Sequence, residues 1–342
     1  MRPTTARALG VLQREIATVL LVILVVVCAL LSPNFLSLTN LGNLADQIPV
    51  FGILAAGQML VILTGGIDLS VGSLLALCAF VAAALSFFGV VPALLGSLLV
   101  GAIVGAINGA GAAYTRVPPF IVTLAMLSVV RGVALEAAAL YHGASFTGTG
   151  ASPVSASREH GFPFLAEGNI LGLPTGFWIA AAIFALLAYV LRYTRFGRHV
   201  YAVGGNETAA LLLGVDVRRV KVAVYALSGT LAGLAGALYA SRELSAPPTA
   251  AVGYELDAIT AVVVGGTLLT GGVGTVRGTI VGLLVVRILP NIFNLLGLDP
   301  AWQQVARGGI LLAVVMLQLP IALRSRARKL AASAPIEATH VR

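Results

Sequence analysis

The polar side chains inside apolar stretches are the residues of this chain that are best placed to do chemistry. Asp68 lies in the glycine-rich run at residues 65–73, GGIDLSVGS, between two long apolar stretches. A carboxylate within hydrocarbon costs at least about 2.5–3.5 kcal/mol, so Asp68 should face a cavity, an interface or water. Two roles remain open. Asp68 either caps the helix that follows, with Ser70 assisting, or otherwise supports the structure there, or it contacts a ligand directly.

Uncharged amides form a second group of candidates. Six of them fall within apolar runs: Gln58, Asn108, Asn291, Asn294, Gln303 and Gln304. An amide both donates and accepts hydrogen bonds, which suits a polar ligand without charge. The same groups equally bond one membrane helix to another. Asn108 and Asn294 are our candidates for lining a transport route.

No motif indicates that the chain itself is an enzyme. It has no Gly-x-x-x-x-Gly-Lys-Ser/Thr phosphate loop, which argues against its being an ATPase. No cluster of His, Cys and acidic residues has the spacing of metal ligands. No set of a nucleophile, a base and a residue that orients the base stands out. Cys28 and Cys78 both lie in apolar runs, where unreactive buried thiols are expected. We therefore predict no catalytic residue, no metal and no cofactor bound by this chain.

The composition is that of a membrane protein. Of the 342 residues, 58% are hydrophobic and only 10% are charged, and the mean hydropathy is +0.99. A soluble protein carries about 25% charged residues to cover its surface. The net charge of +8 comes from Lys and Arg in short loops between apolar runs. That placement indicates helix orientation and argues against a nucleic-acid partner.

Ten apolar runs predict about ten transmembrane helices in an all-α integral membrane protein. Most are long enough to cross about 30 Å of hydrocarbon. The eighth is short and runs into Gly271, Gly272 and Gly274, so a broken or half-depth segment is expected there. We expect one membrane domain at residues 1–322 and a disordered cytosolic tail at residues 323–342. The runs are at residues 16–31, 48–64, 71–88, 90–114, 118–140, 176–191, 222–240, 258–270, 278–296 and 303–322.

The distribution of basic residues predicts the orientation. Arginines precede the first run, six Lys and Arg residues lie in the loop at residues 192–221, and four follow at residues 324–329. The long loop at residues 141–175 has one Arg and no Lys. With ten crossings, the three basic clusters fall on one side, which the positive-inside rule assigns to the cytosol. Both termini are then cytosolic, and the loop at residues 141–175 is external.

The cytosolic loop contains a predicted short helix. Asn206 is a suitable N-cap, Glu207 places negative charge at the positive end of the helix dipole, and Gly214 suits the C-terminal stop. The helix carries three consecutive leucines, at residues 211–213. These leucines either bind in a groove of a partner protein or pack under the membrane helices. Their spacing does not decide between the two interpretations.

Four stretches resemble those of a known family. The run Glu207-x-Ala209-Ala210-x-x-x-Gly214 resembles the cytosolic coupling loop of binding-protein-dependent ABC importer permeases. Residues 65–73, 225–236 and 254–276 are similar to motifs of the ribose/xylose/galactose-type sugar permeases. The resemblance covers residues 30–322. Arg131 and Arg307 stand where the family suggests a basic residue. Arg287 departs from the family's pattern, and the sequence offers no explanation for it.

The resemblance implies a function and partners. The chain would be the permease of an ATP-driven monosaccharide importer in the bacterial cytoplasmic membrane, with a type II ABC importer-like bundle. It would work as a homodimer or paired permease with the pathway at the interface. A separate cytosolic ATPase would bind ATP and Mg, and a periplasmic or lipid-anchored sugar-binding protein would dock outside. The implied coupling residues are Asn206, Glu207, Ala209, Ala210, Leu211 and Gly214.

One glycine-rich pattern occurs twice in the sequence. Residues 63–73 and 269–279 share the order Leu-Thr-Gly-Gly, then an aliphatic residue, then Gly. Gly-interrupted segments in corresponding places of two halves point to a transport pathway, although a match this short also arises by chance. Our pathway and gating candidates are Gly65, Gly66, Asp68, Ser70, Gly72, Gly271, Gly272 and Gly274, with Asn108 and Asn294.

Three other functions remain as alternatives. A branched-chain amino acid permease of the same superfamily would favour charged groups along its route. A secondary transporter would need a proton or sodium relay, for which only Asp68 and Glu136 offer themselves. A structural membrane scaffold fits poorly with so many glycine-broken spans. The identity of the sugar does not follow from the sequence.

Overall fold

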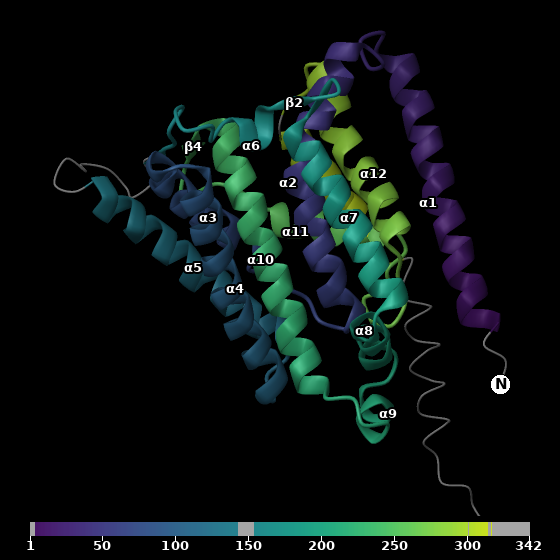
Figure 1. Cartoon of the computed structure of the whole chain (residues 1–342). Helices are drawn as coiled ribbons and strands as arrows, with labels where there is room; N and C mark the ends of the chain where they lie inside the picture. Colours follow the sequence, from purple (N-terminus) through teal and green to yellow (C-terminus); the bar gives the residue numbers. More distant parts are fainter. Residues whose placement is uncertain (1–3, 143–153, 300, 314–315, 317–342) are drawn as a thin grey trace, which may run out of the picture.

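The computed structural model describes residues 4–142, 154–299, 301–313 and 316 as a bundle of helices (Figure 1). Helix α1 (Thr4–Leu31) lies at one edge and α2 (Leu38–Leu63) in the middle of the bundle. The other elements are α3 (Val71–Leu85), η1 (Ser86–Phe88), α4 (Val90–Tyr114), α5 (Pro119–His142), α6 (Phe164–Glu167), α7 (Thr175–Tyr193), α8 (Arg195–Gly205), α9 (Glu207–Leu212), α10 (Val217–Glu243), α11 (Tyr254–Val264) and α12 (Val276–Leu295). Residues 301–313 are also helical.

In the part of the chain that the structure describes, seven helical segments are long and apolar enough to cross a membrane: α2, Val71–Phe88, α4, α5, α7, α10 and α12. The all-α membrane class is therefore confirmed. Helix α11 has 11 residues, which agrees with the expected half-depth segment. The tenth apolar run lies partly outside the described residues, and the tail at residues 323–342 lies wholly outside them.

The core forms around α2 and α10, because small residues let their neighbours approach closely. Helix α10 packs against α4, α3 and α2. A Cβ atom on Gly101 or Gly105 of α4 would overlap the backbone of α10 at Gly229 and Tyr225. Such contacts between glycines are the usual basis of helix packing in membranes.

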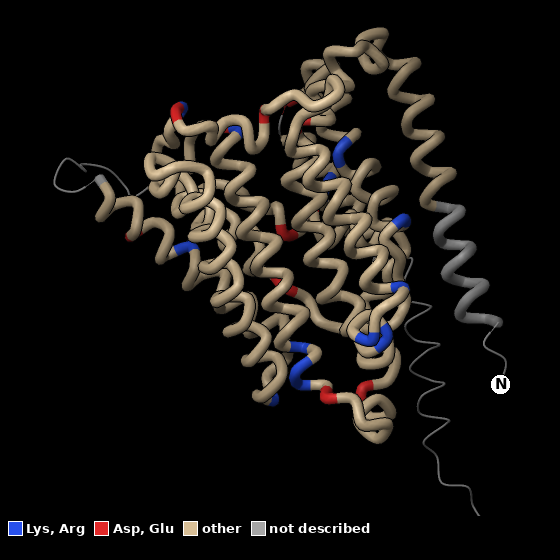
Figure 2. The backbone as a smooth tube through the Cα atoms, in the orientation of Figure 1, with Lys and Arg blue, Asp and Glu red and all other residues tan. Residues whose placement is uncertain are grey.

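The two ends of the bundle differ. Helices α8 and α9 lie at one end, the basic end, where Lys and Arg residues gather near the start of α10 (Figure 2). Helix α6 and four two-residue strands lie at the opposite end, the strand end. Strand β1 (Val154–Ser155) pairs antiparallel with β4 (Ser245–Ala246), and β2 (Asn169–Ile170) with β3 (Leu173–Pro174). In the predicted external loop, residues 143–153 lie outside the described part of the chain.

Candidate functional site

Helix α9 stands apart at the tip of the basic end (Figure 1). The Asn206 side chain accepts a hydrogen bond from the Ala209 backbone N–H at 3.1 Å, so Asn206 is the N-cap. After the helix, Gly214 has φ +81°, a conformation that favours glycine, and the Val215 N–H donates to Ala210 O at 3.0 Å. The predicted start and stop of this helix are confirmed.

The leucines of this segment point away from the bundle. Leu211, Leu212 and Leu213 are 62%, 83% and 84% exposed, whereas Ala210 is 2% exposed. The interpretation in which these leucines pack under the membrane helices is therefore wrong. Ala210 anchors the helix, and the leucines form an apolar surface without a covering element in the described structure.

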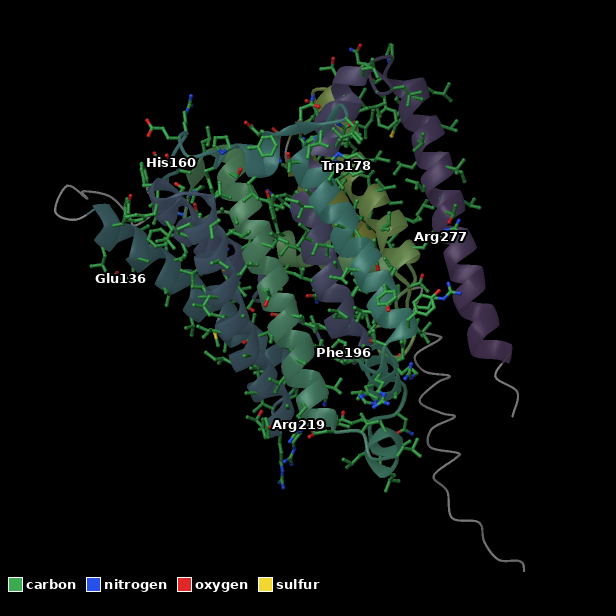
Figure 3. The ribbon with its side chains drawn as sticks, viewed as in Figure 1. Glu136, His160, Trp178, Phe196, Arg219 and Arg277 are labelled. Carbon is green, nitrogen blue, oxygen red and sulfur yellow. The ribbon has the colours of Figure 1, made fainter. Side chains whose placement is uncertain are left out.

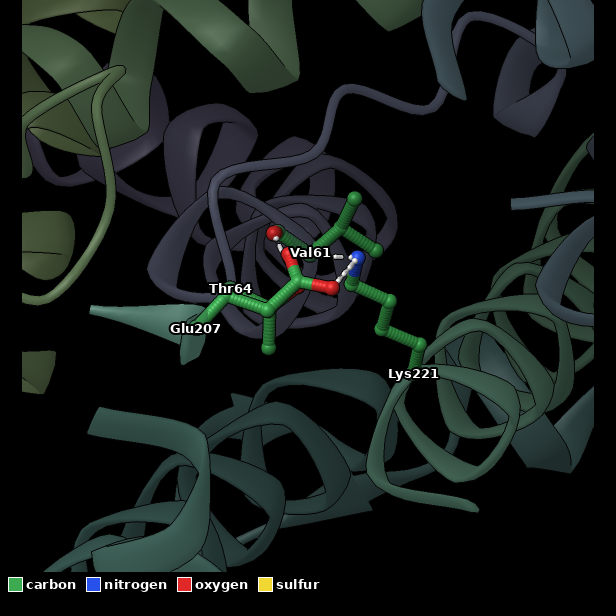
Figure 4. A network of polar contacts seen from close by, with 4 residues as sticks. All are labelled: Val61, Thr64, Glu207 and Lys221. Carbon is green, nitrogen blue, oxygen red and sulfur yellow. Dashed lines mark hydrogen bonds and ion pairs between the residues drawn. The ribbon is translucent and has the colours of Figure 1, made fainter. Parts of the chain in front are cut away.

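One ion pair fastens α9 to the bundle. The Lys221 Nζ atom of α10 lies 2.8 Å from both carboxylate oxygens of Glu207. These two residues belong to one network of polar contacts with Val61 and Thr64 at the end of α2 (Figure 4), where the Thr64 hydroxyl donates to Val61 O. The Lys221 side chain is 15% exposed and the Glu207 side chain 56%, so water reaches the pair from the Glu207 side and its contribution to stability is that of a partly exposed pair.

A groove of about 750 Å³ opens beside α9. Its walls are the end of α4, helix α9 and the first turn of α10, including Tyr114, Thr208 and Arg218. The Arg218 guanidinium lies 5.4 Å from the centre of the Tyr114 ring, and this contact joins α10 to α4. Leu211 lines this groove, so the groove adjoins the exposed leucines of α9.

The two glycine-rich motifs meet each other at the basic end, beside α8. The Gly272 N–H donates to Leu63 O at 2.9 Å, and a Cβ on Gly271 would lie 2.7 Å from the Gly65 nitrogen. Gly204 and Gly205 of α8 complete the contact, since a Cβ on Gly272 would lie 2.7 Å from the Gly205 Cα. We call these five residues, Gly65, Gly204, Gly205, Gly271 and Gly272, the glycine junction.

The glycine junction connects α8, and through Asn206 also α9, to two other parts of the bundle. It joins the end of α2 to the loop between α11 and α12 through direct backbone contact. The Tyr201 hydroxyl of α8 adds a hydrogen bond to Gly274 O at 3.0 Å. A Cβ on Gly274 would meet the side chains of Thr267 and Leu63. A displacement of α8 would therefore be passed directly to α2 and to this loop.

Asp68 lies fully buried between α2 and α3, in a cluster of polar side chains. Its Oδ1 atom accepts hydrogen bonds from the Ser70 N–H at 2.9 Å and the Ser70 hydroxyl at 2.7 Å, and Asn108 Nδ2 donates to the same hydroxyl oxygen at 2.8 Å. The Gln58 carboxamide, with Nε2 towards Asp68 O, makes two hydrogen bonds to the Asp68 backbone, at 3.1 and 3.2 Å. The structure thus brings Asp68, Ser70 and Asn108 together.

Asp68 supports the local structure, as one of the two alternatives expected, but it does not cap α3. Helix α3 begins after Ser70, whose side chain makes no capping hydrogen bond, and the Asp68 carboxylate closes a local turn onto Ser70 instead. Asp68 Oδ2 and Asn108 Oδ1 have no hydrogen-bond partner within the described residues.

The chain matches, over residues 40–315, the family described as "Branched-chain amino acid transport system / permease component". It is also 42% identical over 311 residues to the ribose import permease protein of Escherichia coli, with 90% of this chain and 94% of that protein covered. The chain belongs to this permease family. The permease is 43% identical over 312 residues to the ribose import permease protein of Bacillus subtilis, with 90% and 93% covered.

A further relative is the L-arabinose ABC transporter permease protein of Azospirillum brasilense. It is 37% identical to the permease over 317 residues, and 91% of each chain is covered. No solved structure matches the permease. The resemblance to ABC sugar permeases that the sequence motifs indicated is confirmed.

Other motif residues of the permease pack against α10 and α11. A Cβ on Gly66 would overlap the hydroxyl of Tyr225, which is 1% exposed, and a Cβ on Gly72 would overlap the Glu255 carboxylate. Tyr225 belongs to a motif that carried the family resemblance, but it was not among the predicted site residues. Gly204 and Gly205 were also missed, although the Gly-Gly pair before a good N-cap was the available signal.

Asn294 lies near the end of α12. It is 18 residues beyond Val276, so the α-helical rise places it about 27 Å along α12 from the start of that helix. Its Oδ1 atom accepts a hydrogen bond from Gln303 Nε2 at 2.7 Å. Asn291 exchanges two hydrogen bonds with Asn40, at 2.7 and 3.0 Å. Both amides join helices in this conformation.

The structure shows what the Arg287 side chain contacts, which could not be predicted from the sequence. Its Nη2 atom donates to Gln47 Oε1 at 2.7 Å, and its guanidinium lies 3.7 Å from the centre of the Phe51 ring. Arg131 does not pair with Glu136, which is exposed and projects outward from α5 (Figure 3). Arg131 Nη1 instead donates to backbone carbonyls of the loop before α11, at 2.7 and 2.8 Å.

We expect Asp68→Leu to lower the thermal stability of the permease clearly, and Asp68→Asn to lower it little. Leucine leaves the buried Ser70 N–H and hydroxyl without an acceptor, which costs about 1–3 kcal/mol per unsatisfied group. Asparagine keeps the Oδ1 acceptor and replaces only Oδ2, which has no partner among the described residues. Thermal unfolding of both variants in detergent measures the difference. Equal stability of Asp68→Leu and the wild type would show that the cluster does not hold this loop.

Proposed function

We propose that the permease is the membrane-spanning subunit of an ATP-driven importer that moves a monosaccharide, ribose or a related sugar, across the bacterial cytoplasmic membrane. The observation that carries the proposal is the identity of about 42% over 90% of the chain with proteins named ribose import permease. The chain is a transport subunit of that membrane and is not itself an enzyme.

The topology we propose has ten crossings, with both termini cytosolic and a type II importer-like bundle. It is supported by the gathering of Lys and Arg at the basic end, which would face the cytosol (Figure 2). Two of the crossings would combine a short helix with non-helical chain. Residues 64–70 precede α3, and residues 245–253, most of which are in turns, precede α11.

An import permease of this class implies a partner ATPase and a solute-binding protein. We propose that two cytosolic ATPase subunits, which bind ATP and Mg, hold α9 of each permease copy, and that this chain binds no cofactor. The coupling surface would consist of Asn206, Glu207, Ala209, Ala210, Leu211 and Gly214. Its support is the exposed leucine surface at the tip of the basic end.

We further propose that two permease copies, identical or related, form the pathway at their interface, surrounded by lipid and without nucleic acid. A sugar-binding protein, periplasmic or lipid-anchored, would dock at the strand end. The pathway and gating residues would be Gly65, Gly66, Asp68, Ser70, Gly72, Gly271, Gly272, Gly274, Asn108 and Asn294. The contact of the two glycine motifs in the glycine junction supports this assignment for Gly65, Gly271 and Gly272.

The mechanism follows from the connections of α8 and α9. ATP binding would draw the two ATPase subunits together and displace α9, which Asn206 joins directly to α8. Because α8 contacts the end of α2 and the α11–α12 loop through backbone atoms, it would carry both with it. The bundles would rock, and access to the pathway would alternate.

A branched-chain amino acid permease is the second candidate. The description of the matched family names that substrate class, and this description is the observation that favours it. The names of the most similar proteins, which specify ribose and arabinose, favour sugar.

The proposal is tested by reconstituting the permease in proteoliposomes with its ATPase and binding protein. We expect uptake of ribose that requires ATP inside and the binding protein outside. Uptake of L-leucine but not ribose would show that the substrate is an amino acid and not a sugar. Uptake driven by a proton gradient without the ATPase would show that the permease is not part of an ATP-driven importer. External labelling of a cysteine placed at residues 205–214 would refute the orientation.

A further inference from the structure

Two short helices begin against each other halfway through the bundle. Helix α3 has 15 residues and α11 has 11, and a Cβ on Gly72 in the first turn of α3 would lie 2.7 Å from the Ala251 carbonyl oxygen just before α11. The Tyr254 ring, at the start of α11, lies 4.3 Å from the ring of Phe51, which is at the midpoint of α2. Helices that begin at mid-depth in this way form substrate sites in several transporter folds.

Charged side chains gather at this depth, on α11, α12 and the helix at residues 301–313. Arg307 Nε lies 2.9 Å from Asp257 Oδ1, and Asp257 is 2% exposed. Arg287 of α12 is also buried, and the Phe51 ring and Gln47 hold its guanidinium. Ionised groups at this depth are costly, so their presence indicates a function.

An independent observation points to a ligand. The Oδ2 atom of Asp257 has no hydrogen-bond partner among the described residues, although the side chain is almost completely buried. Asp257 lines a cavity between α11, α12 and the helix at residues 301–313, together with Thr260, Phe293, Gln303 and Arg307. The cavity measures about 20 Å³ in this conformation, which is room for one water molecule.

We propose that this cavity is the closed form of a sugar-contact site, in which Asp257 Oδ2 accepts hydrogen bonds from ligand hydroxyls. Arg307 and Gln303 would donate to ligand oxygens, and the Phe293 ring would cover an apolar face of the ligand. Asp257 and Arg307 neutralise each other, so the lining suits a neutral ligand that both donates and accepts. The inference rests on the proposed function of sugar import.

The site has to widen before it admits a monosaccharide. Its outer wall, the helix at residues 301–313, is exposed along much of its length, with Trp302 63% and Val305 61% exposed. This helix can move away from α11 and α12 at a smaller packing cost than the buried helices.

Thiol labelling tests the site directly. The chain has only two cysteines, Cys28 and Cys78, both of which are buried, so an introduced cysteine is labelled in preference. Ala306→Cys lines the cavity, whereas Val305→Cys on the neighbouring exposed position is the control. In the assembled importer during turnover, we expect D-ribose to slow labelling of Ala306→Cys several-fold and to leave Val305→Cys unchanged. Equal rates with and without ribose would overturn the site, and protection by L-leucine alone would overturn its ligand class.

Uptake by two carboxylate variants supplies a second test. Asp257→Asn is expected to lower ribose uptake about tenfold, equivalent to about 1.4 kcal/mol. Its control is Glu136→Gln, because Glu136 is exposed on α5 and does not line the cavity. A wild type that imports no ribose would refute the proposed function. Full uptake by Asp257→Asn beside an active wild type would refute the site alone, and if Asp257→Asn fails to fold, the labelling result decides.

Discussion

Gly204→Ala is expected to reduce transport by at least about tenfold and to lower the thermal stability of the permease. A Cβ at residue 204 would overlap Leu63 O and lie 2.5 Å from the Gly272 nitrogen, and both are backbone atoms of other elements. Overpacking a core costs about 1–3 kcal/mol, and backbone atoms have less freedom to yield than side chains. The variant would therefore separate α8 from the end of α2 and break the route from α9 into the bundle.

Gly205→Ala is the matched control for this prediction. The neighbouring Cβ would meet nothing within 4 Å, and both positions lie at the end of α8. Thermal unfolding in detergent and ATP-driven uptake in proteoliposomes measure both variants. If Gly204→Ala behaved like Gly205→Ala, the glycine junction would neither hold the fold together nor transmit the motion of α8.

The double substitution Leu212→Asp with Leu213→Asp is expected to abolish assembly with the ATPase and to leave the permease itself folded. Both side chains are more than four-fifths exposed, so little packing within the chain is lost. Burying a leucine in a partner contributes about 1.5–3 kcal/mol, so losing two weakens the complex by about two orders of magnitude or more. Co-purification with the ATPase, together with the melting temperature of the isolated permease, measures the two effects.

Leu171→Asp is the control for the leucine prediction. Leu171 is 87% exposed in the turn between β2 and β3, at the strand end. One leucine is then replaced by aspartate, instead of two, at the end that would face away from the ATPase. Normal assembly of the double variant, or equal loss with Leu171→Asp, would contradict the role of α9 as the docking helix.

The class and the helices of the permease followed from local patterns. Apolar runs of membrane-spanning length indicated the helices, because lipid selects length and hydrophobicity independently of tertiary contacts. Helix α9 was also predictable, since Asn206 and Gly214 act on backbone groups within a few residues of themselves. The family resemblance rested on motifs of the same local kind.

The roles of individual polar residues were less predictable. Asp68 was expected to cap α3, but its carboxylate bonds to Ser70, and Ser70 in turn bonds to Asn108 of α4. Arg287 had no account until the fold placed it on the Phe51 ring, 236 positions earlier in the chain. Periodicity and spacing carry no information about such distant partners.

The sequence by itself determined that this chain is a helical membrane permease with a capped, leucine-bearing helix in its basic loop. Only the tertiary structure decided that both glycine-rich motifs meet α8, that the leucines of α9 lie uncovered, and that α3 and α11 begin against each other at mid-depth. The physical reason is the separation along the chain between the residues that interact. Hydropathy and capping are set by neighbours within a turn or two, whereas backbone contacts such as that of Gly272 with Leu63 join residues more than 200 positions apart.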